Sequence, residues 1–133
     1  MFKAYQYVFY RIYVWSCNTW GEKELPHLNA ALGMAALTLF NIYTLLVIIE
    51  IITGIPFMFF GAYSKQELIV PALIYVIPHC YILLGNKRYK KIIAEYNQQG
   101  KEVHKKNTWW VMAYVIGTPL FYLLALSIAW FAY

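Results

Sequence analysis

Hydrophobic positions dominate the chain, and polar positions occur in short clusters between long apolar runs. The longest run lies between Glu24 and Lys65, where Glu50 is the only residue with a formal charge. It exceeds the roughly 20 residues that cross a bilayer as a helix, whereas a helix of a water-soluble domain keeps one polar face. The pattern therefore predicts an all-α integral membrane protein that forms a single domain over 1–133.

This run predicts a first transmembrane helix over 28–53. The helix should start close to Pro26, because proline suits the first turn of a helix. It should end near Gly54, since Pro56 lacks a backbone donor and clashes with the preceding turn of a continuing helix. We expect 54–67 to form an external loop.

Two further transmembrane helices are predicted, over 68–85 and 109–133. The second span is short, about 27 Å at 1.5 Å per residue, and we expect Pro78 in its interior to kink it. The third has aromatic residues at both ends, which are typical of membrane interfaces. These residues are Trp109, Trp110, Trp130 and Tyr133.

The segment 86–108 carries most of the positive charge of the chain. Its apolar residues recur at helical spacing, which predicts a basic amphipathic helix over 87–98 that lies on the membrane and stops at Gly100. The expected basic surface, which would face lipid headgroups or a ligand, consists of Lys87, Arg88, Lys90, Lys91, Lys101, Lys105 and Lys106. Anionic lipids are the expected partners of this surface, and nucleic acid is not.

The N-terminal segment 1–27 is predicted to form an interfacial amphipathic helix followed by a turn. A signal peptide does not fit, because Gln6 and Arg11 interrupt the apolar pattern and no small-residue cleavage site follows. A fourth span is the alternative, but it would place Arg11 near its centre at a cost of about 2.5 to 3.5 kcal/mol. The side chains expected to point inward are Phe2, Phe9, Ile12 and Trp20.

The positive charge predicts the orientation of the chain, because lysine and arginine collect on the cytoplasmic side of membrane proteins. The segment 86–108 and the N-terminus are therefore expected in the cytoplasm. The loop 54–67 and the C-terminus are expected outside, with the protein in the inner (plasma) membrane.

Five polar side chains fall in one layer of the predicted bundle when depth is counted at about 1.5 Å per residue. They are Thr38, Asn41, Tyr75, His79 and Thr118. We interpret the layer first as hydrogen bonding between helices, worth about 1 kcal/mol per contact. The alternatives are a pore lining, a proton relay or a ligand pocket, and for these His79 is the strongest candidate because imidazole changes charge near neutral pH.

Glu50 is expected near the external end of the first span, some 15 Å in depth from His79. It is interpreted as a carboxylate at the outer edge, with Lys65 as its partner. The alternative is a carboxylate at the mouth of a pore.

Small residues predict helix-packing faces, because close backbone approach favours association in lipid. They are Ala31 and Ala35 in the first span, and Ala113, Gly117, Ala125 and Ala129 in the third. Such faces serve packing within one subunit or between subunits.

Signatures of known enzyme chemistry are missing from the sequence. It contains no Asp, no P-loop, no nucleophile elbow and no HExxH motif. The histidines lack metal-ligand spacing and the cysteines form no CxxC pair. We therefore expect no enzymatic activity, no cofactor and no metal.

Three function classes remain. We favour a homo-oligomeric component that conducts ions or perturbs the membrane, as small defence effectors and toxins do. The second class is an accessory or immunity-type subunit that binds another membrane protein, and the third is a small lipid-acting enzyme or transporter.

Overall fold

The computed structural model describes residues 3–55 and 65–132, which form helices and no strand. The helices are α1 (Lys3–Trp20), α2 (Pro26–Thr53), α3 (Lys65–Leu84), α4 (Arg88–Asn97) and α5 (Lys101–Ala132). Short 3₁₀ turns, η1 (Glu22–Glu24) and η2 (Gly85–Lys87), join α1 to α2 and α3 to α4. Within the described residues, α2, α3 and α5 provide three stretches long and apolar enough to cross a membrane. The prediction of an all-helical chain with three such helices is confirmed.

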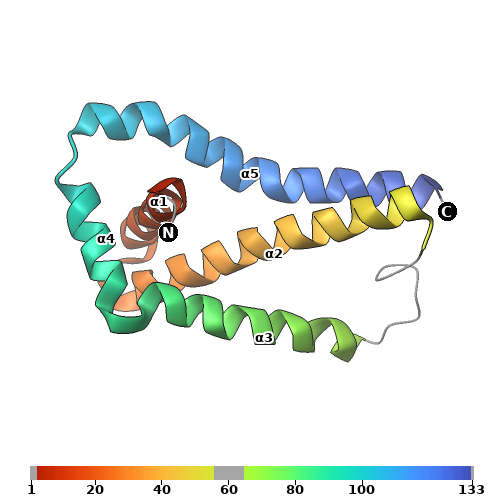
Figure 1. The fold of residues 1–133 in the computed structure, drawn as a ribbon. Coiled ribbons are helices and arrows are strands. Elements are labelled where there is room, and N and C mark those ends of the chain that lie inside the picture. The colour runs from red at the N-terminus through yellow and green to blue at the C-terminus, as the bar shows by residue number, and fades with distance from the viewer. Residues whose placement is uncertain (1–2, 56–64, 133) are drawn as a thin grey trace.

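The three long helices form a single layer with α2 in the middle (Figure 1). Helices α3 and α5 each pack against α2, on opposite sides of it. Helix α1 is set across this layer at the end where α2 begins, and α4 lies at the same end (Figure 1). We call it the basic end, because the exposed side chains of Lys87, Arg88, Lys90 and Lys91 gather there.

The ends of α2 follow from local backbone chemistry. Leu25 precedes the helix in the left-handed conformation, with φ 50°, and Pro26 occupies the first turn. Gly54 ends the helix at φ 67°, and its N–H donates to the carbonyl oxygen of Glu50 at 2.9 Å. Glycine adopts this conformation without the steric cost that a side chain brings.

The second half of the chain differs from the predicted boundaries. Helix α5 begins at Lys101, so residues 101–108 are helical and not part of a loop. Helix α3 begins at Lys65, three residues earlier than the predicted span. Helix α4 falls within the predicted range 87–98, and residues 56–64 of the expected external loop lie outside the described residues.

The inner face of helix α1 packs against other helices of the protein, whereas it was expected to contact lipid. Phe9 is completely buried in the hydrophobic cluster at the basic end. The side chain of Ile12 faces Gly33 of α2, where an added Cβ would lie 3.4 Å from it. Trp20, which was expected to point inward, is 52% exposed, and Phe2 lies outside the described residues. The main apolar cluster therefore joins α1, α2, α3, α4 and α5 at the basic end.

Candidate functional site

His79 lies between two tyrosine hydroxyl groups. Its Nδ1 is 3.0 Å from the hydroxyl oxygen of Tyr75, one turn earlier on α3, and its Nε2 is hydrogen bonded to the hydroxyl of Tyr5 on α1. A neutral imidazole has one donor and one acceptor nitrogen, so one tyrosine hydroxyl accepts a hydrogen bond from the ring and the other donates one to it. His79 thereby connects α1 to α3.

Thr38 and Tyr5 extend this contact to α2. The hydroxyl of Thr38 donates to the carbonyl oxygen of Met34 at 2.8 Å, and Thr38 lies close enough to Tyr5 to influence its hydroxyl group. Burial raises the pKa of Tyr5 to about 12, with a smaller contribution from nearby Tyr75. Tyr5 was missed by sequence reasoning, because its partner in α3 is 74 residues away.

The other members of the predicted layer lie on the α5 side of α2. The Asn41 side-chain N–H donates to the hydroxyl oxygen of Tyr114 at 2.8 Å. Thr118 is buried in α5, one turn beyond Tyr114. The predicted layer is thus divided into a Thr38, Tyr75 and His79 group toward α3 and an Asn41 and Thr118 group toward α5.

Glu50 is buried in the last turn of α2, far along the helix from the basic end. Only 1% of its surface is exposed, so it lies between helices, and its depth near the outer edge of a membrane stays a prediction. The side chain of Lys65, its expected partner, lies outside the described part of the chain.

The predicted small-residue faces are used in different ways. Ala31 and Ala35 are buried near the start of α2, and Ala125 and Ala129 are buried on α5 next to Val47. Ala113 is exposed, and a Cβ added at Gly117 would meet nothing within 4 Å. Ala113 and Gly117 line a groove of about 670 Å³ along α5. The other residues of its lining are Lys105, Thr108, Trp109, Met112, Ile116 and Leu120.

A histidine and tyrosine cluster joins α1, α4 and α5 at the basic end. His104 Nε2 is 3.0 Å from the carbonyl oxygen of Tyr96, so this nitrogen must donate. In the neutral ring Nδ1 then accepts from the Tyr7 hydroxyl at 3.2 Å, and the two rings stack with an interplanar angle of 8°. Tyr10 completes the cluster, since its hydroxyl donates to Asn97 at 2.9 Å. Burial is the main cause that raises the pKa of Tyr7.

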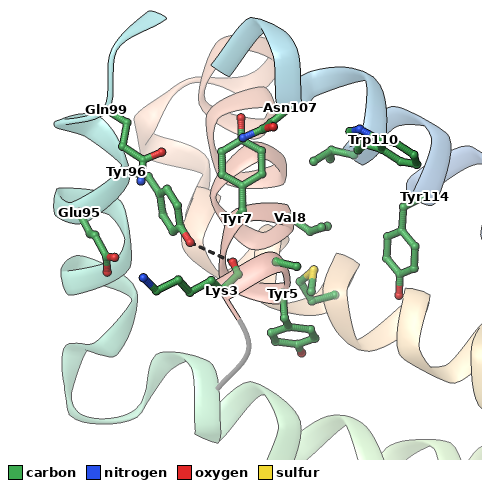
Figure 2. Close-up of a pocket in the computed structure, with 13 residues that line it drawn as sticks. Lys3, Tyr5, Tyr7, Val8, Glu95, Tyr96, Gln99, Asn107, Trp110 and Tyr114 are labelled. Atoms are coloured by element: carbon green, nitrogen blue, oxygen red, sulfur yellow. Dashed lines mark hydrogen bonds between the residues drawn. The ribbon is translucent and has the colours of Figure 1, made fainter. Parts of the chain in front are cut away.

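A pocket of about 720 Å³ opens beside this cluster (Figure 2). Side chains from α1, α4 and α5 point into it (Figure 2), and Met34 of α2 also lines it. Its wall is tied together by the Tyr96 hydroxyl, which donates to the carbonyl oxygen of Lys3 at 2.9 Å. Sequence reasoning did not identify the pocket, because its residues come from four helices that the sequence alone does not bring together.

The predicted basic surface lies outside this pocket. Lys87, Arg88, Lys90, Lys91 and Lys105 have exposed side chains. The side chains of Lys101 and Lys106 are outside the described part of the chain. The exposed cations therefore form an outer surface that is distinct from the pocket lining.

Metal chemistry has no site among the residues that the structure describes. No group of three His, Cys, Asp or Glu side chains could hold a metal ion there, and Cys17 and Cys80 are free.

Comparison with known proteins gave no match to this chain among protein-family models, curated proteins or solved structures.

Proposed function

We propose that the chain is a membrane protein without enzymatic chemistry that assembles into homo-oligomers and conducts ions or perturbs the bilayer. The open layer of α2, α3 and α5 is the observation that carries this proposal (Figure 1). Large apolar side chains on both outer helices are uncovered, such as Ile77 at 68% and Leu120 at 59% exposure. Further copies would cover part of this surface and enclose a path that three helices in one layer cannot enclose.

The groove on α5 supports contact with a second copy. Ala113 and Gly117 leave the backbone accessible, which permits the close approach that favours helix association in lipid. The groove lies on the side of α5 away from Ala125 and Ala129, which pack toward α2. A second helix in this groove would therefore leave the contacts within one chain intact.

The hydrogen bonds around His79 support an ion or proton path. Ionisable groups within membrane spans commonly mark such paths, and Tyr5 and Tyr75 provide a hydroxyl at each ring nitrogen. Protonation of the ring at Nδ1 and Nε2 would turn both nitrogens into donors. The proposed orientation places this group nearer the cytoplasm, with the basic end and N-terminus inside and the C-terminus outside the plasma membrane.

Filling the groove tests the proposal. Gly117→Phe should raise the dissociation constant of the oligomer at least about tenfold, which corresponds to about 1.4 kcal/mol, and should reduce the depolarisation caused by induced expression. The measurements are the size of the detergent-solubilised protein and the signal of a membrane-potential dye. Ile128→Phe is the matched control, because Ile128 is 51% exposed on α5 and does not line the groove.

A monomeric wild-type protein that leaves the membrane potential unchanged would overturn the proposal. If such a monomer instead binds another membrane protein through the α5 groove, the accessory-subunit alternative is favoured. Gly117→Phe would then abolish that binding, and Ile128→Phe would retain it.

A further inference from the structure

The pocket at the basic end has walls held by hydrogen bonds between helices. The Tyr96 hydroxyl joins α4 to the first turn of α1, and His104 joins α5 to both through Tyr96 and Tyr7. Pockets that bind small molecules are usually formed in advance of binding. These bonds therefore keep the volume of about 720 Å³ open to a ligand.

One end of the pocket carries both signs of charge. Lys3 from α1 and Glu95 from α4 both line it, and Figure 2 shows them at the α4 end. Both side chains are exposed, so neither charge is buried before a ligand binds. Gln99 and Asn107 add neutral hydrogen-bonding groups to the lining.

The pocket becomes apolar along α5. Val111 and Tyr114 line it one and two turns beyond Asn107, and Val8 faces it from α1. Asn107 and Tyr114 are separated by about 10 Å at 1.5 Å per residue. The pocket thus runs from a polar, charged end to an apolar end, in the direction in which α5 enters its candidate span at Asn107.

We infer that this pocket binds one zwitterionic phospholipid of the surrounding bilayer. Lys3 meets the lipid phosphate, and Glu95 meets the lipid ammonium group. The acyl chains lie over Val8 and Val111, farther along α5. The inference rests on the proposed placement in a membrane but is independent of oligomer formation and of ion conduction.

The charge balance of the pocket distinguishes it from the outer basic surface. Lys3 and Glu95 together have no net charge, which matches a headgroup with one positive and one negative group. The exposed cations of η2 and α4 instead attract anionic lipids without requiring an ammonium group. The two surfaces therefore select different lipids.

The inference is tested by native mass spectrometry of the full chain in detergent. The protein is mixed with equal amounts of phosphatidylethanolamine and phosphatidylglycerol that have identical acyl chains. We expect one molecule of phosphatidylethanolamine to be retained preferentially. Glu95→Gln and Lys3→Gln should each weaken this retention about tenfold, as the loss of a charged hydrogen bond does. Free phosphoethanolamine should not displace the lipid, because it lacks the apolar part.

Lys90→Gln and Lys91→Gln are the matched controls, since both lysines are exposed on α4 and neither lines the pocket. They should retain phosphatidylethanolamine as the wild type does. Equal retention of both lipids by the wild type, or undiminished retention by Glu95→Gln and Lys3→Gln, would overturn the inference. Displacement by free phosphoethanolamine would show that the pocket binds the headgroup alone and would overturn the inference that a lipid is the ligand. Absence of the protein from the membrane fraction of cells would instead overturn the proposed function.

Discussion

Tyrosine hydroxyls make most of the side-chain hydrogen bonds that join one described helix to another. Tyr5 contacts α3, Tyr7 contacts α5, and Tyr10 and Tyr96 connect α1 with α4. The phenol ring packs against apolar neighbours while its hydroxyl group finds a polar partner. Helix α1 is therefore held to the bundle by groups that are at once apolar and hydrogen bonding.

Tyr5 predicts a loss of stability at high pH. Its pKa is about 12 in the folded chain and 10.0 as a free side chain. As pH rises through this window, the unfolded chain loses the Tyr5 proton while the folded chain keeps it, so the free energy of unfolding falls. The free energy of unfolding in detergent, measured from pH 9 to 12 at steps of about one pH unit, should show this decrease.

Tyr5→Phe should make the decrease less steep, because the substituted side chain has no proton to lose. The slopes are compared and not the stabilities themselves, since Tyr5→Phe also removes the hydrogen bond to His79. The pKa of Tyr7 is raised as well, so part of the slope remains. An unchanged slope in Tyr5→Phe would contradict the prediction.

Among the elements, the connection from α3 to α4 shows a backbone cost. Asn86 and Lys87 both have left-handed conformations, with φ 53° and 57°. Asparagine tolerates this conformation, but a lysine in it costs roughly 1–2 kcal/mol. The connection turns the chain from α3 into α4, which places the basic helix beside α1.

Glycine should relieve the cost at this connection. We expect Lys87→Gly to raise the free energy of unfolding by about 0.5–1 kcal/mol, after allowance for the greater freedom of glycine in the unfolded chain. Lys90→Gly, inside α4, should lower the same free energy by about 1 kcal/mol. Denaturant unfolding in detergent measures both variants, and a destabilised Lys87→Gly protein would show that the lysine side chain has another role.

The sequence was sufficient to predict α2, because charge is absent over most of a long apolar run and Pro26 and Gly54 mark its ends. It was not sufficient for the first two turns of α5, which are polar. These turns are stabilised through His104 by α1 and α4, and a contact between residues 97 positions apart leaves no local pattern. The depth count brought His79 and Tyr75 together but could not include Tyr5, since α1 was expected to contact lipid.

The whole molecule is an open layer of three long helices with α1 across one end (Figure 1). If α1 does not cross the bilayer, three crossings place the two termini on opposite sides. Four crossings, with α1 as an additional span, would place them on the same side. The positions of the termini therefore distinguish the two arrangements.

Protease treatment of intact cells measures these positions. A tag at the C-terminus should be removed by external protease, and a tag at the N-terminus should survive until the cells are lysed. Most of each tag should show this behaviour, because lysine and arginine beside a span favour the cytoplasmic side. Equal protection of both tags would contradict the proposed orientation.

The central position of α2 also has a consequence for biosynthesis. Helix α2 precedes α3 and α5 along the chain and contacts both. A growing chain that enters the membrane can therefore place α3 on one side of α2 and later α5 on the other, without separating helices that have already packed. The bond between Tyr7 and His104 must form late, because it needs the start of α5 to have been synthesised. Helix α1 precedes α5 along the chain, so it can pack on α2 early and gains its bond to α5 only later.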